Sequence, residues 1–461
     1  MIVTYEEATR AQKEIEDGLL EDPNIVSVGV VEEIDKLGKK TGNYVIQVGI
    51  VSSEIYQHSL NKIEKSIPEE YELLPKIKGQ EKKHIRINVV EEGQIQALNS
   101  NIEKTDFPSA EDKLSENITE HKAIGYRVRP SLCGSSIGHP TITAGTMGLL
   151  LEYVDGPDKG NAYILSNNHV LAANNSGHVG DAIIQPGSFD AGQVGKDTIG
   201  HLHRWVPLAI RGKINYVDAA VAEVCEKYQW SKSASPCISN IGMPNNFAKA
   251  EMDIDVEKTG RTTGYTQGRI VSINESIKVK YTTLGLLIFK NQIRTTQMSR
   301  PGDSGACLVK RDSKEPVGLL FAGSNTASYF NDINMAVSSL SNKHVNVNPA
   351  TGNSIIFDKV PNFKMIRREY STSNFSDKRT LFQELGTIGF SSSSANKRSL
   401  LFFGIGCFLA KGLSEFTKSE ALVPTLTSTK PVQVLTFLFG DKHRTLSHHL
   451  DSGVKKSFKV K

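Results

Sequence analysis

The chain is 461 residues long and carries 54 Lys and Arg against 50 Asp and Glu, a formal net charge of +4. This length exceeds one ordinary hydrophobic core, so two or three folded units are expected. A content of 38% hydrophobic and 23% charged residues indicates a soluble globular chain with some disordered stretches. No stretch reaches the ~20 apolar residues that a membrane-spanning helix needs, and the first residues lack the basic start and apolar core of a signal peptide.

Five cysteines are spread along the chain: Cys133, Cys225, Cys237, Cys307 and Cys407. They are odd in number and far apart, and none forms a Cys-x-x-Cys pair, so they indicate reduced structural thiols and not a disulfide or zinc framework. A cytoplasmic location is therefore expected. His201 and His203 fall on one face of a predicted strand, but no cysteine or acidic cluster completes a metal shell. The sequence predicts neither a metal nor a cofactor.

The first 98 residues are expected to form a small α+β domain. An amphipathic helix comes first, followed by two strands, a second helix that stops at Pro68, and a strand of alternating polarity. The predicted elements are, in chain order, residues 5–20, 25–34, 44–51, 53–67 and 84–90. A ferredoxin-like arrangement is one candidate for this order. Residues 99–121 are polar and charged, and are predicted to be a linker.

Residues 122–345 alternate short β-rich runs with glycine turns, which predicts a mainly β domain with a two-barrel antiparallel fold. Residues 346–461 are predicted to form a basic, largely disordered tail. From residue 351 onward the tail holds 17 Lys and Arg against 8 Asp and Glu, and its apolar patch at 400–410 is too short to span a membrane. The basic excess could contact nucleic acid or an anionic surface, but no nucleic-acid motif accompanies it.

Ser304 lies in the segment Gly302-Asp303-Ser304-Gly305. A serine hydroxyl is a weak nucleophile unless a base removes its proton and donors stabilise the oxyanion that forms. Glycines at 302 and 305 permit positive φ and close backbone approach, so the amides of Gly302 and Ser304 can point into one small pocket. An ordinary polar turn is the alternative, because Gly, Asp and Ser are common turn formers.

Two upstream segments supply a candidate base and a candidate acid. His169 ends a short apolar strand, and Asp218 interrupts the apolar run 214–222. Taken singly, such a histidine is usually structural and such an aspartate is usually a turn or a cap. Together they can form a hydrogen-bonded pair, because an acid buried in an apolar run needs a partner. An imidazole that donates its Nδ1 hydrogen to Asp218 keeps Nε2 ready to accept the proton of Ser304.

The order His, Asp, Ser and the motifs around it resemble the trypsin/chymotrypsin superfamily of serine peptidases, most closely the narrow-leaf-type trypsin-like peptidases of plants and their bacterial relatives. The matching segments are residues 134–139, 143–148, 165–171, 185–187, 217–221, 258–264 and 318–324. The resemblance covers about residues 125–342 well and, more loosely, the first 100. It implies two antiparallel six-stranded β-barrels with the site in the cleft between them. It implies that His169 is the general base, Asp218 its orienter and Ser304 the nucleophile. The amides of Gly302 and Ser304 would form the oxyanion hole.

The same resemblance implies that Met298, Ala322 and Gly323 bind the substrate. Met298 lies six residues before the nucleophile, where trypsin-like enzymes have the base of the primary specificity pocket, so medium apolar side chains are expected to be preferred over Arg or Lys. The chain departs from animal digestive members at Val170, where they have a disulfide-forming cysteine. It departs again at Phe321, where they often have a serine that hydrogen-bonds the aspartate. Asp218 is therefore expected to be less well anchored.

The sequence thus predicts a serine endopeptidase that cuts protein or peptide substrates through an acyl-enzyme. The alternative is a non-catalytic trypsin-fold module that binds peptides without cutting them, and contact of the tail with nucleic acid is compatible with either. Self-cleavage is expected in the linker and the tail. The N-terminal domain either covers the cleft before cleavage or is a permanent module without an inhibitory role. The second role is favoured because the sequence shows no pattern for an inhibitory strand.

Overall fold

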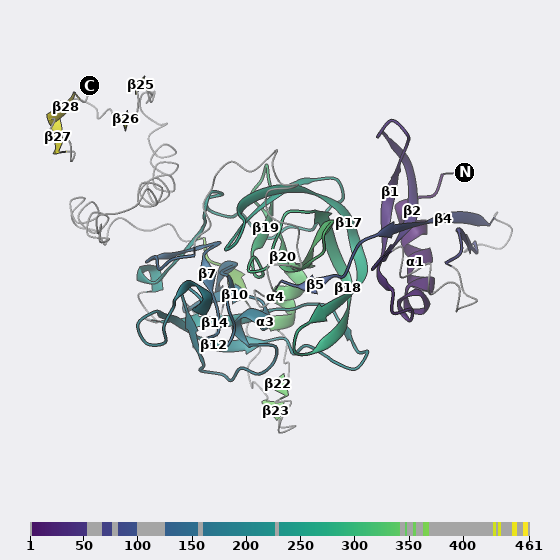
Figure 1. The fold of residues 1–461 in the computed structure, drawn as a ribbon, viewed down its shortest axis with the longest axis horizontal. Helices are drawn as coiled ribbons and strands as arrows, with labels where there is room; N and C mark the ends of the chain where they lie inside the picture. Colours follow the sequence, from purple (N-terminus) through teal and green to yellow (C-terminus); the bar gives the residue numbers. More distant parts are fainter. Residues whose placement is uncertain are drawn as a thin grey trace. The chain divides into compact units, whose positions relative to one another are not determined.

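A computed structural model describes most of the first 341 residues and short pieces beyond them (Figure 1). The described residues are 2–52, 67–75, 82–98, 125–154, 160–225, 230–341, 346–347, 354–355, 363–367, 427–429, 432–434, 445–449 and 455–459. They are mainly β-structure, as predicted. The chain separates into two compact units, Met1–Ser376 and Asp377–Lys461.

In the second unit the structure describes two antiparallel strand pairs. Strand β25 (Thr427–Thr429) pairs with β26 (Val432–Val434), and β27 (Thr445–His449) pairs with β28 (Lys455–Lys459). The apolar patch at 400–410 and most of the basic residues lie outside the described part of the tail. The predicted disorder of the tail and its contact with nucleic acid therefore stay predictions.

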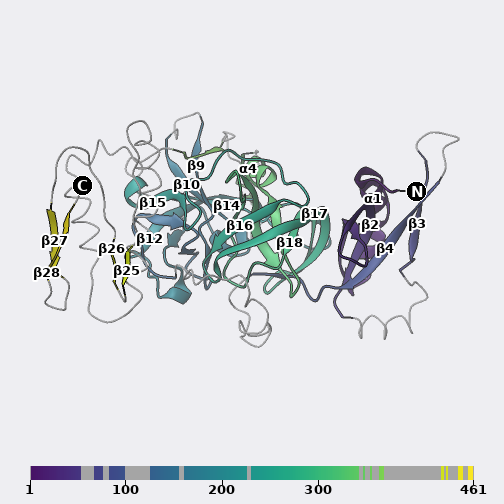
Figure 2. The same ribbon diagram turned by 90° about the horizontal axis from the view of Figure 1, so that it is seen from above.

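The chain begins with one helix packed against a small sheet. Helix α1 (Tyr5–Leu20) starts with a capping box, in which the Glu7 amide donates to the Thr4 hydroxyl and the Thr4 amide donates to the Glu7 carboxylate. Its buried face, which includes Ala8 and Ala11, contributes to a hydrophobic core with apolar side chains of the strands. Figure 2 shows the helix lying over one face of these strands.

Four strands form that small sheet: β1 (Ile25–Ile34), β2 (Lys40–Ile50), β3 (Glu70–Leu73) and β4 (Lys83–Glu91). Strand β2 pairs antiparallel with β1 and parallel with β4, and β3 pairs antiparallel with β4. The predicted helix at 5–20 and the predicted strands at 25–34, 44–51 and 84–90 are confirmed. Residues 53–66, where a second helix is predicted, lie outside the described residues.

Two large sheets build most of the rest of the first unit. The six-stranded sheet has the order β11 (Ala182–Ile184), β12 (Thr198–Trp205), β14 (Ala220–Val224), β10 (Ala162–Ser166), β9 (Leu149–Tyr153) and β24 (Phe363–Met365). The larger sheet has the order β13 (Ile214–Asn215), β18 (Gly285–Thr296), β21 (Ala327–Asp332), β20 (Pro316–Gly323), β19 (Cys307–Lys310), β16 (Asp255–Gly260) and β17 (Gly264–Tyr281), followed by β1, β2, β4 and β3.

The long strand β17 joins the larger sheet to the N-terminal strands, because it pairs antiparallel with β1 (Figure 1). The prediction of two separate six-stranded barrels is therefore not confirmed. Strand β24 lies within the range predicted to be the tail, yet it pairs with β9. The division at residues 98, 121 and 345 stays a prediction.

The remaining described elements are short: β5 (Gln96–Ala97), β6 (Ser131–Cys133), β7 (Ser136–Ile137), β8 (Gly145–Thr146), α3 (Asn168–Leu171), a 3-10 turn (Ser188–Asp190), a second one (Trp230–Lys232), β15 (Ala234–Ile238), α4 (Ile333–Ser341), β22 (Asn346–Val347) and β23 (Ser354–Ile355). One of them matters for the site. Strand β5 follows the N-terminal sheet in sequence but pairs with β17 and β20 of the larger sheet.

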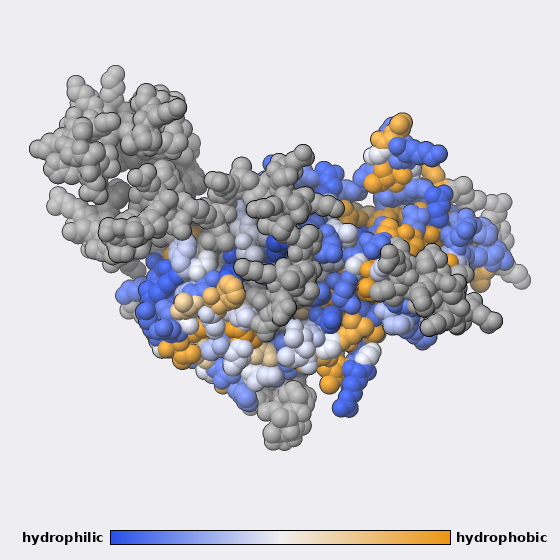
Figure 3. Space-filling view, viewed as in Figure 1, coloured by the Kyte–Doolittle hydropathy of each residue, from blue (hydrophilic) through white to orange (hydrophobic). Residues whose placement is uncertain are grey.

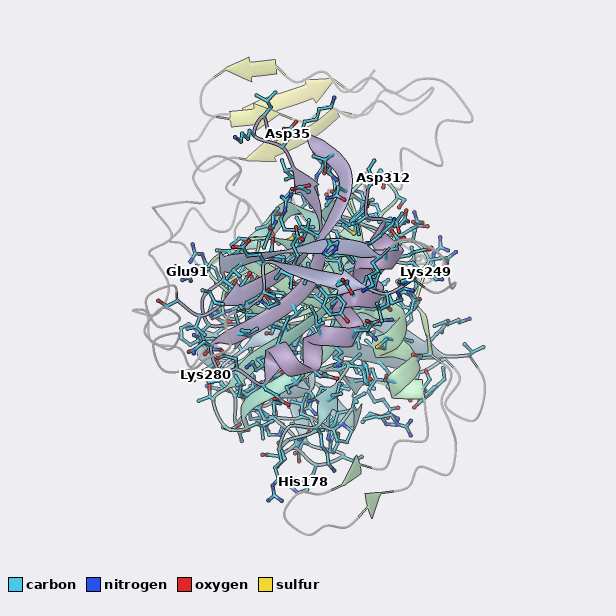
Figure 4. The ribbon with its side chains drawn as sticks, turned by 90° about the vertical axis from the view of Figure 1, so that its right-hand side faces the viewer. Asp35, Glu91, His178, Lys249, Lys280 and Asp312 are labelled. Carbon is cyan, nitrogen blue, oxygen red and sulfur yellow. The ribbon has the colours of Figure 1, made fainter. Side chains whose placement is uncertain are left out.

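Polar and apolar residues are interspersed over the described surface in Figure 3. The charged side chains labelled in Figure 4, such as Asp35, Lys249 and Asp312, lie on the outside of the molecule. Within the described ranges, no helix has the length and apolar character to cross a membrane. Four cysteines lie in these ranges: Cys133 and Cys307 are buried free thiols, and Cys225 and Cys237 are half-buried.

Candidate active site

Two neighbouring strands bring His169 and Asp218 together. Strand β10 pairs antiparallel with β14, with Ser166 opposite Ala220. His169 follows the end of β10 on the short helix α3, and Asp218 lies just before the start of β14. Because the strands are antiparallel, the end of one lies beside the start of the other. His169 Nδ1 is 2.6 Å from Asp218 Oδ2, and the His169 amide donates to Asp218 Oδ1 at 3.2 Å.

The aspartate is held from several sides. The Tyr281 hydroxyl donates to Asp218 Oδ2 at 2.6 Å, the Asp218 amide donates to Asn331 Oδ1 at 2.9 Å, and the Asn167 side chain donates to the Asp218 carbonyl at 2.7 Å. Burial raises the pKa of Tyr281 well above its usual range, and the charge of Asp218 raises it further. The tyrosine therefore remains a donor. The expectation that Asp218 is poorly anchored is wrong, because a hydroxyl from β17 takes the place of the missing serine.

The second nitrogen of His169 remains available. Its Nδ1 lies against a carboxylate, so Nδ1 carries the hydrogen and Nε2 of the neutral ring is an acceptor. Nε2 is buried and makes no hydrogen bond with any described residue. In particular, no hydrogen bond joins it to Ser304. Val170, the residue after the histidine, and Ser304 both approach one glycine: a Cβ at Gly145 would lie 2.5 Å from the side chain of Val170 and 3.1 Å from the Ser304 carbonyl oxygen.

The loop around Ser304 depends on its glycines. Gly302 and Gly305 both have φ near +96°, a region that side-chain-bearing residues rarely adopt. Space forbids a side chain as well, because a Cβ at Gly302 would lie 2.3 Å from the Thr262 hydroxyl oxygen and one at Gly305 would lie 2.2 Å from the Thr146 carbonyl oxygen. The glycine requirement predicted from the sequence is thus a matter of both φ and packing.

A buried ion pair fixes the same loop from behind. Lys258 Nζ is 3.2 Å from Asp303 Oδ2, and both side chains are fully buried. The carboxylate of Asp303 also accepts from the amides of Thr262, Thr263 and Arg300, and from the Thr263 hydroxyl at 2.6 Å. Burial lowers the pKa of Lys258, and the charge of Asp303 opposes that shift. Lys258 lies in one of the matching motifs, but its role is visible only through this contact.

Ser304 and Gly302 converge on one carbonyl oxygen, that of Leu98. The Gly302 amide donates to it at 2.9 Å, and Ser304 Oγ lies 3.3 Å away. Ser304 Oγ is also 3.5 Å from the Phe321 carbonyl oxygen. A backbone donor and a candidate nucleophile thus lie at one carbonyl group, which are two of the features that acyl transfer requires. Leu98 was not among the residues that the sequence singled out.

The three predicted substrate-binding residues surround the same segment. Ala322 and Gly323 on β20 pair antiparallel with Ala97 and Gln96 of β5. Met298 is buried in a hydrophobic cluster that includes Leu98. All three predicted substrate-binding residues thus lie beside residues 96–98 of the same chain.

The two histidines considered as metal ligands have other neighbours. His201 Nδ1 is 3.8 Å from the Cys225 sulfur, and His203 Nε2 is 2.7 Å from the Tyr153 hydroxyl. The described residues contain no group of three or more His, Cys, Asp or Glu side chains arranged to hold a metal ion.

No family model matches the sequence, and no curated protein matches it either. Solved structures that resemble part of the chain include protease A of Thermobifida fusca, which is 16% identical and covers 45% of this chain and 94% of its own, with a TM-score of 0.32. A Nocardiopsis protease is 17% identical, with coverages of 45% and 95% and a TM-score of 0.32. The chymotrypsin of Cellulomonas bogoriensis is 16% identical, with coverages of 45% and 94% and a TM-score of 0.31.

These structural neighbours are trypsin/chymotrypsin-like serine proteases. The narrow-leaf-type subgroup is not shown by any of the three comparisons.

Proposed function

We propose that the chain is a serine endopeptidase that hydrolyses peptide bonds through an acyl-enzyme. Ser304 is the nucleophile, His169 the general base and Asp218 the group that orients the histidine. The amides of Gly302 and Ser304 stabilise the oxyanion. Met298, Ala322 and Gly323 bind the substrate.

One observation carries the proposal: the Gly302 amide and Ser304 Oγ meet at the Leu98 carbonyl oxygen, at 2.9 and 3.3 Å. The loop that presents them is held by the buried Lys258–Asp303 pair, so the donor is in place before any substrate arrives. Preorganised donors of this kind contribute about 3–4 kcal/mol to transition-state stabilisation in acyl-transfer enzymes. A surface turn would not need this degree of support.

The chemistry follows from these positions. Ser304 Oγ attacks the carbonyl carbon of a bound peptide while His169 Nε2 accepts its proton. Asp218 stabilises the imidazolium that forms, and the oxyanion lies against the amides of Gly302 and Ser304. The histidine then gives the proton to the leaving amine. A water molecule repeats the sequence on the ester and releases the acid.

The two sheets around the site would correspond to the two β-barrels of trypsin-like enzymes, with the N-terminal strands added to one of them. The sequence motifs support membership in the narrow-leaf-type subgroup. The cysteine pattern supports a cytoplasmic location.

Labelling with a fluorophosphonate probe tests the proposal, because the probe reacts covalently with a serine only when a base and an oxyanion site activate it. Leu98→Asp, in which the segment bound at Ser304 is weakened, should gain one adduct at Ser304, and the wild-type chain should gain the same adduct more slowly. Ser304→Ala should gain none, whereas Ser338→Ala, which removes a hydroxyl from the exposed side of α4, should label normally. Absence of an adduct in both wild type and Leu98→Asp would leave a peptide-binding module without catalysis as the function.

A further inference from the structure

The segment that follows the N-terminal sheet occupies the candidate site as an added strand. Gln96 and Ala97 pair antiparallel with Gly323 and Ala322, and the Leu98 amide donates to the Phe321 carbonyl at 3.2 Å. Addition of an extended segment to an exposed strand is a common mode of peptide binding, in which main-chain hydrogen bonds supply affinity and side-chain pockets supply specificity. The chain's own residues 96–98 are bound in this way.

A second strand holds the same segment from the other side. The Lys280 amide donates to the Ile95 carbonyl at 2.9 Å, and Gln96 pairs with Lys280 in parallel register. Ile95 is fully buried in a hydrophobic cluster with Phe321 and Tyr281. Glu91 and Lys280 lie on the same side of the molecule in Figure 4, where the chain leaves the N-terminal sheet. The segment is therefore packed as part of the fold.

Leu98 has the position that a residue at the cut bond needs. Its carbonyl oxygen accepts from the Gly302 amide, and Ser304 Oγ lies 3.3 Å from that oxygen. We propose, building on the serine-peptidase function above, that this site cleaves its own chain after Leu98 and that peptides with leucine at the cut bond are its substrate class.

The side-chain pocket explains the choice of leucine. Leu98 is only 1% exposed and lies in the same apolar cluster as Met298 and Leu320. A Cβ at Gly323 would lie 3.3 Å from Leu98 Cδ2, so a side chain at 323 would crowd the pocket. The side chains that pack with Leu98 in this cluster are apolar, so a branched apolar side chain fits among them.

The bond that breaks joins the Leu98 carbonyl carbon to the nitrogen of Asn99, the next residue in the sequence. Ser304 Oγ forms a bond to that carbon, and its proton passes to His169 Nε2 and then to the departing nitrogen. The new amine becomes the N-terminus of residues 99–461. Water then hydrolyses the ester and leaves a carboxylate on Leu98. The reaction consumes one water molecule and needs no other reactant.

The N-terminal fragment would remain bound after the cut. Glu92 is buried and accepts from Arg294 at 2.6 Å, from Ser324 at 2.7 Å and from Thr326 at 2.8 Å. Strand β1 remains paired with β17. Residues 1–98 would thus stay as a product whose last strand fills the site. The cut enzyme therefore requires release or displacement of this strand before it accepts another peptide.

The experiment is to express the full chain and to determine, by intact mass and N-terminal sequencing, where it is cut. Wild type should yield residues 1–98 and a fragment that begins at Asn99. Ser304→Ala should remain uncut, and Leu98→Met should be cut at the same bond. Leu98→Asp should lose this cut, whereas Leu37→Asp, the same change at a leucine that is 92% exposed, should not affect it. The two fragments of the wild type should co-elute in gel filtration.

The outcomes separate the inference from the function on which it rests. If the wild type is intact but the fluorophosphonate labels Ser304 in wild type or in Leu98→Asp, self-cleavage is refuted and the peptidase stands. If the chain is intact and neither protein is labelled, both proposals fail. If Ser304→Ala is cut after Leu98 as well, another protease makes the cut and the inference is overturned. Equal cleavage of Leu98→Asp and wild type at this bond would refute the pocket assignment.

Discussion

Tyr281 donates its hydroxyl hydrogen to Asp218 over 2.6 Å, although 63 residues separate them in the chain. The contact links the end of β17 in the larger sheet to the aspartate beside β14 in the six-stranded sheet. Its ring also meets that of His169 edge-on, at a centroid distance of 6.0 Å. The tyrosine hydroxyl therefore positions both the acid and the base, while the tyrosine ring packs in the same hydrophobic cluster as Ala97.

Removal of that hydroxyl should slow catalysis without affecting peptide binding. A hydrogen bond to a charged group contributes about 1.5–3 kcal/mol, so Tyr281→Phe should lower kcat for peptide hydrolysis about ten- to hundredfold and leave KM nearly unchanged. Tyr71→Phe removes another tyrosine–carboxylate hydrogen bond, 2.7 Å from Glu14, far from the site. That control should keep the wild-type kcat. An equal loss in both variants would mean that Tyr281 acts only through stability.

Lys258→Met should destabilise the fold and abolish activity, because it leaves the Asp303 carboxylate buried without its cation. Breaking a buried pair in this way costs about 3–5 kcal/mol. The control is Lys82→Met, which removes an exposed 2.7 Å pair with Glu72 and should leave the free energy of unfolding nearly unchanged. Urea unfolding of both variants measures the difference. Similar midpoints for the two variants would contradict the structural role of the buried pair.

Gly302→Ala should eliminate turnover, while Gly285→Ala should only reduce stability. Both glycines have positive φ, so each substitution costs about 1–2 kcal/mol of backbone strain. Only the Cβ at 302 meets another atom, Thr262 Oγ1 at 2.3 Å, whereas the Cβ at 285 finds open space. Relief of that clash moves the amide that faces the Leu98 carbonyl. Wild-type kcat in Gly302→Ala would exclude this amide from the oxyanion site.

The free energy of unfolding should depend on pH through Lys278, which contacts the last residue of helix α1. Burial lowers the pKa of this lysine to about 8, with Asp22 opposing the shift, and its ammonium donates to the Leu20 carbonyl at 3.0 Å. An unfolded lysine titrates near ~10.4. Between these two values the unfolded chain binds more protons than the folded one, so this group makes the free energy of unfolding rise with pH.

The test compares urea unfolding at about pH 8 and about pH 10 in wild type and Lys278→Met. The part of the increase in the free energy of unfolding that is due to Lys278 should be absent in Lys278→Met. Lys280→Met, two residues along the same strand but exposed, should retain it. Identical pH profiles for wild type and Lys278→Met would contradict the assignment.

The residues of the site differ in how far sequence alone can reveal them. His169, Asp218 and Ser304 lie in local motifs, and the pairing of β10 with β14 brings the first two together as expected. Tyr281 lies in no such motif, and the motif that contains Lys258 does not show what this lysine does. Their partners lie 63 and 45 residues away, and a lone Tyr or Lys in a strand is ordinary.

Strand β5, which lies at the candidate site, could not be predicted from the sequence. Strand β5 has only two residues, Gln96 and Ala97, too few for any periodicity. Its pairing depends on Gly323 and Lys280, which lie far along the chain. The sequence therefore favoured an N-terminal module without an inhibitory role, whereas the contacts of Leu98 support the opposite. The pairing of β17 with β1 is also long-range, so strand patterns alone do not show that the larger sheet continues into the N-terminal strands.

The most direct test of the account is the combined effect of Ser304→Ala and His169→Ala on hydrolysis of a fluorogenic peptide with leucine at the cut bond. If the two residues act as one unit, each single variant should lose several powers of ten in kcat, about 10⁴ to 10⁶, and the double variant should lose no more than the worse single one. Losses that multiply in the double variant, or wild-type turnover by Ser304→Ala, would contradict the account.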